Sequence, residues 1–591
     1  MARSSRRRPL GQPVGRPLCS GRRCVLGRVQ ALAGERSQPP TGIWTASRTG
    51  SSVGPRTPPQ PAPKPPPLRG GWQPPFAGGE FGAARRQAPA HSRAPGGGGR
   101  TLDWVTSDGV ASLLRFDAPL RRDWEDLVRR SLRGDSPETL VGRTADGLDI
   151  QPLYTAAPAP AGGDAAGLPG LASFIRGGGA RSGRWDLCQR HDLDDPAETN
   201  AAIREDIAGG VSGIWLRLRR PPAPGELLAT LAGVNPAETS VVVDGGPWLV
   251  AAAEAAAALA AAAPPGWLVA AVDPLGALAR CGFLLVDLED TLACLVPFLR
   301  AASQREERAA ACRISVDAAV YCDAGAPPAL ELACMLATGV AYLRALEAGG
   351  LAPAQAAPYL EARLAATPDQ FATISKFRAA RALWDRVQTA CGVADPERRG
   401  LRCWAVTSEA AFVAQDPFVN LARATIAAFA AAAGGAERIT VLPHDVALGP
   451  PGERSRRLAR NVSHLLADET HLGAVIDPAG GAWYVEDRTA RLAEAAWERF
   501  GEIEAAGGMA SALLDGSLAR RIQRAAECRS ERLAGGAEHV VGVTCHPPPG
   551  GCSEPAGATQ AVQPDAAASP PDAAVTVPPL PLRHPVPGEP A

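Results

Sequence analysis

The sequence predicts an α/β protein built on a closed eight-stranded parallel barrel, the TIM (β/α)8 barrel. Short β-branched runs alternate with helix-like stretches over several hundred residues, and this alternation is typical of a parallel sheet. The number of repeated units favours a closed barrel over an open sheet. A doubly wound sheet is the competing architecture, but no Gly-rich GxGxxG turn opens a helix after the early strands.

The strands and helices are expected where the hydrophobic period changes between two and 3.6 residues. Strands are expected at residues 211–218, 239–243, 266–272, 312–316, 403–407 and 438–442. Helices are expected at 198–208 and 371–387, where apolar residues return every three or four positions. The Ala-rich run 249–263 is interrupted by Glu254 and is too short and too weakly hydrophobic to span a bilayer, so it predicts an ordinary helix.

The two ends of the chain differ in composition from its middle. Residues 1–100 are rich in Pro, Gly, Arg and Ser, and residues 547–591 are rich in Pro and Ala, so both are expected to be disordered. The Arg-rich start superficially resembles a transit peptide, but no amphipathic face repeats along it, which favours a disordered extension. We assign 101–165 to an N-terminal arm and 166–546 to the barrel with a C-terminal helical extension.

Charge and cysteine content exclude several classes of protein. Lys plus Arg equals Asp plus Glu, 61 each, so nothing in the net charge attracts nucleic acid, and no membrane partner is expected. The 13 cysteines are odd in number, scattered and never spaced as CxxC, which predicts reduced thiols in the cytoplasm rather than disulfides or a zinc site. They are Cys19, Cys24, Cys188, Cys281, Cys294, Cys312, Cys322, Cys334, Cys391, Cys403, Cys528, Cys545 and Cys552.

The most specific stretch lies between residues 456 and 509. It contains RRLARN at 456–461, ETHL at 469–472 and DPAGGAWYVE at 477–486. This succession resembles the methylmalonyl-CoA mutase family, whose barrels end with an R-x-A-R-N helix, an E-x-H-L turn and a D-P-A-G-G-S-Y-Y-V-E segment. The similarity continues through LAEAAW at 492–497 and IEAAGGM at 503–509.

Further matching segments follow in family order and cover almost all of residues 101–546. They are 124–132, GRTADG at 142–147, PLY at 152–154, FIRG at 174–177, DPLGALA at 273–279, SKFRAARALW at 375–384 and QDPFVN at 415–420. Each alone has an ordinary explanation as a loop or a solvated helix face. Their shared order makes the resemblance specific, and among the family it is closest to the small, non-catalytic subunit.

The resemblance implies a carbon-skeleton rearrangement in which adenosylcobalamin supplies the radical. Catalytic members carry a C-terminal cobalamin domain whose D-x-H-x-x-G loop provides a histidine ligand to cobalt. Only 591 − 547 = 44 residues follow Pro547, so we expect no complete cobalamin-binding domain and no cobalamin bound in the family manner. The motif surrounds none of the eight histidines, which are His91, His191, His444, His464, His471, His539, His546 and His584.

Two further catalytic elements of the family lack their reactive residues here. The family's S-G-Y-H-M-Q-E-A-G-A segment matches DAAVYCDAGA at 317–326, which places Val320 where the catalytic histidine stands. Valine cannot donate a hydrogen bond to a substrate carbonyl. The family's M-Y-A-F-R-P-W-T-I-R-Q segment matches ARSGRWDLCQ at 180–189, which keeps Trp185 and Gln189 but lacks the tyrosine; Arg184 is a candidate for the basic position.

Other candidate residues have plainer explanations. Tyr321, Cys322 and Asp323 follow a strand, where barrel active sites form, but no basic residue near Cys322 in sequence would lower its pKa. His471 is expected to be a packing and capping residue. The pair His444 and Asp445 is expected in a loop because Pro443, Pro450 and Pro451 surround it.

The resemblance predicts the small subunit of a heterodimeric adenosylcobalamin-dependent mutase that interconverts (R)-methylmalonyl-CoA and succinyl-CoA. This chain would have no catalytic, cofactor-binding or metal residues, and a homologous large subunit would hold the adenosylcobalamin and the acyl-CoA. The alternative is an autonomous, diverged acyl-CoA mutase barrel that uses a separate cobalamin-binding subunit. A third possibility is that residues 1–100 and 547–591 result from a truncation or reading-frame error.

Overall fold

The structure is a computed structural model that describes residues 121–133, 135–155, 166–178, 184–260, 268–303, 312–548 and 573–581. The expected disorder of residues 1–100 lies outside these ranges. The chain divides into two compact units, and the second, residues 45–140, contributes the described helix α3 (Arg121–Ser131) and the short turn η1 (Pro137–Leu140). The barrel, its helices and the C-terminal strand β12 belong to the first unit.

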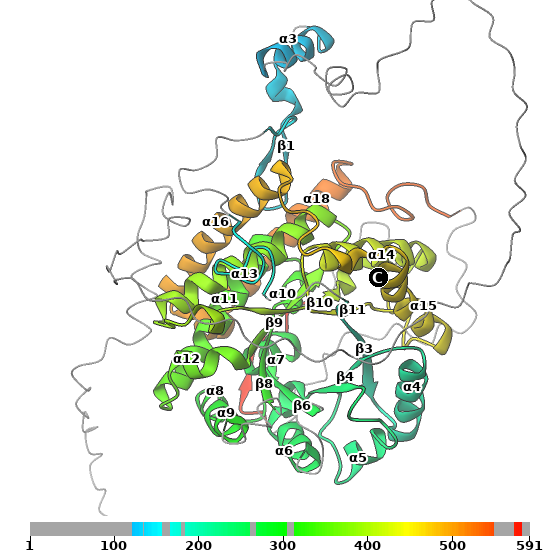
Figure 1. The fold of residues 1–591 in the computed structure, drawn as a ribbon, viewed down its shortest axis with the longest axis vertical. Helices are drawn as coiled ribbons and strands as arrows, with labels where there is room; N and C mark the ends of the chain where they lie inside the picture. Colours follow the sequence, from blue (N-terminus) through cyan, green and yellow to red (C-terminus); the bar gives the residue numbers. More distant parts are fainter. Residues whose placement is uncertain are drawn as a thin grey trace, which may run out of the picture. The chain divides into compact units, whose positions relative to one another are not determined.

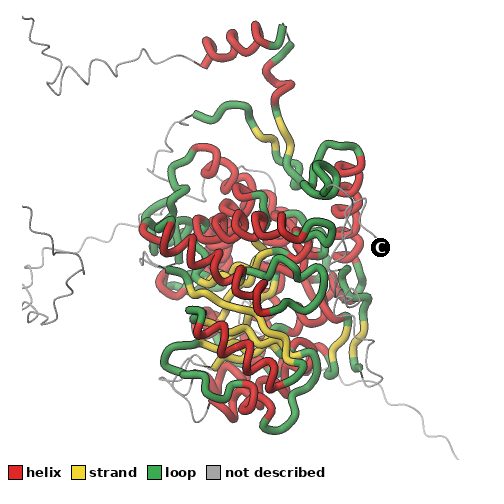
Figure 2. Tube along the Cα trace, turned by 90° about the vertical axis from the view of Figure 1, so that its right-hand side faces the viewer, coloured by secondary structure: helices red, strands yellow, loops and turns green. Residues whose placement is uncertain are grey.

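Eight parallel strands close into a barrel in the order β10, β11, β3, β4, β5, β6, β8, β9 (Figures 1 and 2). The strands are β3 (Asp186–Leu193), β4 (Gly213–Leu218), β5 (Ser240–Asp244), β6 (Leu268–Val272), β8 (Cys312–Asp317), β9 (Leu360–Ala366), β10 (Arg402–Thr407) and β11 (Arg438–Thr440). Closure is made where Arg438 and Ile439 of β11 pair with Asp186 and Leu187 of β3. The predicted TIM barrel is therefore confirmed.

All six strands expected from the sequence are present, with small shifts at their ends. The expected helices 198–208 and 371–387 are α4 (Pro196–Ala208) and α13 (Gln370–Ala390), and the Ala-rich run forms α6 (Leu249–Ala260). The sequence did not indicate β3 and β9. Both carry charged residues at alternate positions, which obscures the apolar pattern of a buried strand.

Helices surround the barrel in the regular βα succession (Figure 1). The remaining longer helices are α7 (Pro274–Cys281), α9 (Leu295–Ser303), α11 (Pro328–Ala348), α14 (Pro417–Ala433), α15 (Glu453–His464), α16 (Trp483–Ala505), α17 (Gly508–Leu514) and α18 (Ser517–Ala534). An aspartate followed by proline starts several of them: the Asp195 carboxylate accepts from the amides of Ala197 and Glu198 at the start of α4, which satisfies amides that the helix itself leaves unbonded.

Helix α11 is the one helix in the described residues that is long and apolar enough to cross a membrane. Most of it is buried inside the protein, where it packs against α13 and α16. A core helix of a large domain has this composition because protein covers it on all sides. The apolar composition of α11 is therefore explained by its place in the hydrophobic core.

Part of the tail expected to be disordered is docked on the barrel. Strand β12 (Val575–Thr576) pairs antiparallel with β7 (Phe283–Leu284). The Val577 amide donates to the Gly282 carbonyl at 2.7 Å, the Leu580 amide donates to the Ala279 carbonyl at 2.9 Å, and Leu580 is buried. The expectation of disorder is therefore wrong for residues 573–581, since Val575, Val577 and Leu580 supply apolar side chains that pack on the barrel.

Candidate functional site

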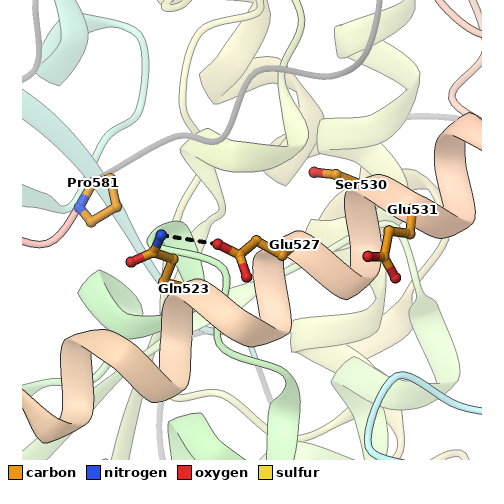
Figure 3. Close-up of a pocket in the computed structure, with 5 residues that line it drawn as sticks. All are labelled: Gln523, Glu527, Ser530, Glu531 and Pro581. Carbon is orange, nitrogen blue, oxygen red and sulfur yellow. Dashed lines mark hydrogen bonds between the residues drawn. The ribbon is translucent and has the colours of Figure 1, made fainter.

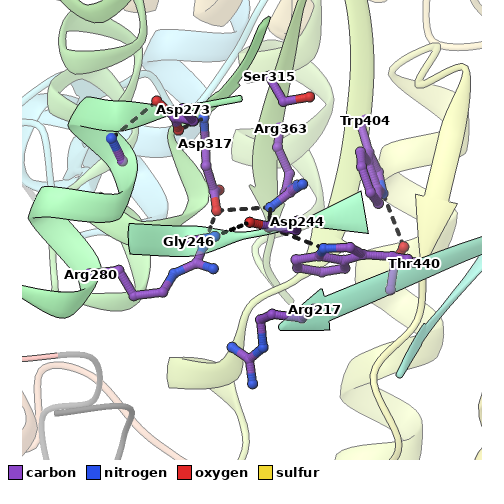
Figure 4. Close-up of polar contacts among 12 residues, drawn as sticks. Arg217, Asp244, Gly246, Asp273, Arg280, Ser315, Asp317, Arg363, Trp404 and Thr440 are labelled. Carbon is purple, nitrogen blue, oxygen red and sulfur yellow. Dashed lines mark hydrogen bonds and ion pairs between the residues drawn. The ribbon is translucent and has the colours of Figure 1, made fainter. Parts of the chain in front are cut away.

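The carboxyl ends of the barrel strands form the end at which TIM-barrel enzymes bind and convert substrates. Alternate residues of each strand point into the barrel, since the side chains of a strand alternate between its two faces. The inward residues include Trp215 of β4, Arg363 of β9 and Trp404 of β10. We call the group that these residues form with the acids around them the barrel mouth (Figure 4).

Arg363 lies inside the barrel against two indole rings, which themselves pack edge to face with centroids 5.2 Å apart. Its guanidinium carbon lies 4.0 Å from the centre of the Trp215 ring and 4.3 Å from that of Trp404. Each indole N–H is occupied as well: Trp215 donates to Asp244 at 3.1 Å and Trp404 donates to Thr440 at 3.0 Å. Arg363 is only 2% exposed, so the cation is held by aromatic faces and not by water.

Two aspartates complete the surroundings of Arg363. Its Nη1 lies 3.0 Å from Asp244 Oδ2 and 3.0 Å from Asp317 Oδ2, and Arg280 donates to the same oxygen of Asp317 (Figure 4). Burial opposes ionisation of Asp244, but attraction by Arg363 and Arg280 exceeds this effect and lowers the pKa of Asp244. The four groups therefore neutralise one another as two cations and two anions.

The rim of the mouth is paired in the same way. Arg217 binds Asp192 through two hydrogen bonds of 2.8 and 2.9 Å, and Arg190 donates to Glu409. Although burial opposes it, attraction by Arg217 and Arg190 lowers the pKa of Asp192. Bidentate pairing of this kind fixes both side chains in one geometry, which leaves neither group available to a substrate.

Two other carboxyls of the mouth hold their protons more tightly than usual. Burial raises the pKa of Asp273 to about 6, although the Tyr342 hydroxyl and the Asp317 amide donate to it. Burial and the nearby charge of Glu409 raise the pKa of Asp323 to about 7, against a 2.6 Å hydrogen bond from the Ser408 hydroxyl. A carboxyl group with a raised pKa can mark an acid catalyst, but Asp273 and Asp323 each accept hydrogen bonds from protein groups.

Val320 lies in the short helix α10 (Ala319–Asp323), directly after β8. It is 2% exposed and contributes only carbon atoms to the mouth. Next to it the Tyr321 hydroxyl is buried with no hydrogen-bond partner among the described residues. The position that the resemblance assigns to a catalytic histidine is thus apolar in space as well as in sequence.

Cys322 does not have the environment of a reactive thiol. Partial burial and the charge of Glu331 raise the pKa of its thiol, although Lys376 acts in the opposite direction. Lys376 is itself bound to Glu331. The sequence did not indicate that a lysine lies near Cys322, because Lys376 comes from α13, 54 positions away in the chain (376 − 322). Since Lys376 is paired with Glu331, it does not lower the pKa of the thiol enough to deprotonate it.

The remaining sequence candidates are dispersed over the barrel. Arg184 is exposed and pairs with Asp468 at 3.2 Å, and Gln189 is buried with no hydrogen-bond partner among the described residues. His444 and Asp445 lie in a loop, as expected, and His444 stacks on Phe418. His471 is exposed and its side chain makes no cap bond, so the prediction that it packs and caps is wrong.

No group of three or more His, Cys, Asp or Glu residues that could hold a metal occurs in the part of the chain that the structure describes. A surface hollow of about 580 Å³ lies along α18, lined by Gln523, Glu527, Ser530, Glu531 and Pro581 (Figure 3). Gln523 and Glu527 bond to each other at 2.9 Å. The lining side chains come from the outer side of one helix and from Pro581, and they form no cluster that indicates chemistry.

The closed ring of eight parallel strands with outer helices defines the chain as a TIM-barrel protein. A family model described as methylmalonyl-CoA mutase matches residues 229–561, more than half of the 591 residues. The chain therefore belongs to the methylmalonyl-CoA mutase family, and the resemblance seen in the sequence is confirmed.

Relatives with curated names include methylmalonyl-CoA mutase small subunits and proteins named methylmalonyl-CoA mutase. The methylmalonyl-CoA mutase small subunit of Streptomyces virginiae is 41% identical over 75% of this chain and 73% of the relative. The small subunit of Propionibacterium freudenreichii subsp. shermanii is 36% identical over 73% of this chain and 69% of the relative. The methylmalonyl-CoA mutase of Escherichia coli (strain K12) is 29% identical over 71% of this chain and 63% of the relative.

Proposed function

We propose that this chain is the small subunit of a heterodimeric, adenosylcobalamin-dependent methylmalonyl-CoA mutase and is itself catalytically inactive. The large subunit would interconvert (R)-methylmalonyl-CoA and succinyl-CoA, and this chain would support it as an assembly partner. The names of the relatives that are 36–41% identical support the subunit assignment. We propose no catalytic, cofactor-binding or metal residue in this chain.

The filled barrel mouth is the observation that carries the proposal. Arg363 packs against Trp215 and Trp404 and contacts Asp244 and Asp317. A thioester entering along the barrel axis would have to displace this guanidinium and leave two buried carboxylates without their partner. Breaking a buried ion pair in this way costs about 3 to 5 kcal/mol, which opposes substrate binding before any chemistry begins.

Val320 supports the same conclusion independently. An electrophilic donor placed at the substrate carbonyl commonly contributes about two to three decades of rate, and a buried valine supplies no donor. An autonomous mutase that borrows only a cobalamin-binding subunit would still need this donor in its own barrel. The single-barrel alternative therefore has no observation in its favour.

The cofactor is assigned to the partner for a chemical reason. When bound, adenosylcobalamin supplies the radical that the rearrangement needs. Of the described histidines near the strand ends, His191 faces Asp206 on α4 at 3.1 Å, and His444 stacks on Phe418 in a P-H-D context that differs from the D-x-H ligand motif. The described residues therefore do not fit the family's cobalt ligand, and we assign no step to the cofactor in this chain.

Helix α3 is proposed as part of the arm that contacts the partner. Trp124, Leu127 and Val128 lie three and four positions apart on one face, and none of the eleven residues is buried. An amphipathic helix normally covers such a face. We retain the domain assignment of an arm at 101–165 and a barrel at 166–546, and we propose a cytoplasmic location because nine of the described cysteines are free thiols.

The test is co-expression with the large mutase subunit encoded in the same genome, followed by size-exclusion chromatography and a mutase assay with adenosylcobalamin. Each chain is also assayed alone. We expect turnover only in fractions that contain the large subunit, and co-elution of the two chains. Cobalamin-dependent turnover by this chain alone would overturn the proposal. A stable, soluble monomer that does not bind the large subunit would also overturn it.

A further inference from the structure

Helix α14 exposes an apolar face on the outside of the barrel. Asn420, Ala424, Ala427, Ala428 and Ala431 are buried, and at 100° per residue they fall on one side of the helix. The side toward solvent carries Phe418, Val419, Ala422, Thr425 and Ile426, of which Phe418, Ala422 and Ile426 are exposed, while Phe429 packs against the core. We call these five residues the α14 face. Phe418 is 71% exposed and Ile426 is 41% exposed, which is unusual for side chains of this size.

No charged side chain belongs to the α14 face. Arg423 is the one charged residue in α14, and it is turned to the side of the helix: it donates to the Asn420 carbonyl oxygen of the side chain at 2.7 Å and to the backbone carbonyl of Val541. On either side of Val541, the side chains of Val540 and Val543 pack against the buried Val413 and Leu533. The face itself therefore offers only hydrocarbon and one threonine hydroxyl.

The other outer helices next to the closure of the barrel are different. Helix α4 exposes Glu198 and Arg204, and α15 exposes Glu453, Arg454 and Arg457. These helices have the polar outer face that a barrel helix presents to water. Helix α14 lies beside α15 in the same layer (Figure 1), so its apolar outer face is a local property and not a feature of the whole barrel.

Phe418 is also held in place before any partner arrives. Its ring stacks on His444, with centroids 5.6 Å apart and planes 25° from parallel. An aromatic side chain that is already fixed loses little freedom on binding, and such residues commonly dominate the affinity of an interface. The α14 face thus has a preformed aromatic residue at one end and Ile426 about two turns further along.

We infer that the α14 face is the surface on which the large mutase subunit docks. The inference rests on the proposed function, because the partner is the one that the name "small subunit" implies for the relatives. The absence of charge on the face excludes recognition of nucleic acid or of a charged peptide. An uncharged helical face with large apolar side chains is instead typical of a permanent subunit interface.

The test uses the double variant Phe418→Glu/Ile426→Glu and the control Leu228→Glu. Leu228 is 62% exposed on α5 (Glu226–Thr230) and lies outside the α14 face, so the control places one glutamate at a site of similar exposure away from the face. Each full-length chain is co-purified with the large subunit from the same genome, and the dissociation constant is measured by titration. We expect the double variant to weaken binding at least about 100-fold, since two central apolar contacts each contribute about tenfold or more. The control should bind like the wild type.

The outcomes separate this inference from the proposed function. If the wild-type chain does not bind the large subunit, the proposed function fails. If the wild type binds and the double variant binds equally well, the docking surface lies elsewhere and only the present inference is overturned. If the wild type alone forms a dimer that the double variant dissolves, a second copy covers the face and the inference is also wrong. Circular dichroism and thermal unfolding confirm that both variants are folded.

Discussion

The barrel mouth and the α14 face have opposite characters. The mouth, where a TIM-barrel enzyme is usually open and polar, is filled by two tryptophans, by Arg363 packed against both of them and by its ion pairs with Asp244 and Asp317. The outer surface, where a barrel is usually charged, presents Phe418 and Ile426 to solvent. The difference is what we expect of a barrel that acts as an assembly subunit, as proposed above.

The largest effect is expected in the mouth, from Arg363→Met. The methionine side chain would fill most of the space that Arg363 occupies beside the indole rings. Asp244 and Asp317 would lose the guanidinium that both contact, and Arg280 would be the nearby cation that remains. We expect the free energy of unfolding, measured by urea titration, to fall by about 3 to 5 kcal/mol.

The control for this change is Arg398→Ala. Arg398 and Asp395 form a pair in which both side chains are about half exposed, and such pairs contribute about 0 to 1 kcal/mol. If Arg363→Met unfolds at the same urea concentration as the control, the mouth is not held by its ion pairs, and the contrast with the outer surface disappears.

The pH dependence of stability sharpens the description of the mouth. The pKa of Asp323 is raised from 3.8 to about 7 in the folded state, so its favourable contribution is complete below about pH 4 and is lost as the pH rises toward 7. In Asp323→Asn the amide oxygen can still accept the Ser408 hydroxyl but cannot ionise. We expect wild-type stability to fall between pH 4.5 and 8 by about 2 to 3 kcal/mol more than that of the variant, after allowing for partial exposure. Parallel curves for the two proteins would show that Asp323 titrates normally.

A third change compares surface that the chain covers itself with surface that it leaves open. Gly282 and Gly225 both have φ of +77°, but a Cβ at Gly282 would lie 2.5 Å from the Val577 carbonyl, whereas a Cβ at Gly225 meets nothing within 4 Å. Both alanine variants carry the strain of positive φ, about 1 kcal/mol. Only Gly282→Ala should also release the docked tail, for a further cost of about 1 to 3 kcal/mol.

Hydrogen exchange measured by mass spectrometry reports this release directly. The amides of Ala574, Val577 and Leu580 donate to the barrel in the wild type, so we expect residues 574–580 to lose protection in Gly282→Ala and to keep it in Gly225→Ala. Equal protection in the two variants would mean that the tail docks without the space that Gly282 provides.

The smallest effect is expected at Cys322. Partial burial and Glu331 raise the pKa of its thiol, while Cys528 is exposed on α18. In the folded protein at pH 8, iodoacetamide should modify Cys528 and leave Cys322 unmodified, as read by peptide mass spectrometry. Rapid alkylation of Cys322 would show that Lys376 activates it, and the mouth would regain a nucleophile.

The sequence by itself determined the alternation of strands and helices, and with it the barrel. Six strands were predicted because their β-branched residues are buried on both faces. The strands β3 and β9 were missed because their inward positions carry Asp186, Arg190, Glu361 and Arg363. These residues are charged for a tertiary reason: each meets a partner from another strand or loop in the closed barrel.

The sequence also places Val320 where the family resemblance assigns the catalytic histidine, since that alignment needs only the order of residues. What only the tertiary structure decided is how the mouth is closed and where the surface is open. Arg363 closes the mouth because it packs against Trp215 and Trp404 inside the barrel. These residues are 148 and 41 positions away in the chain (363 − 215, 404 − 363). The α14 face becomes exposed because the helix turns Asn420 and most of its alanines toward the protein and leaves Phe418 and Ile426 outside. Pairing across the barrel and the rotation of a helix depend on contacts between distant residues, which local patterns do not encode.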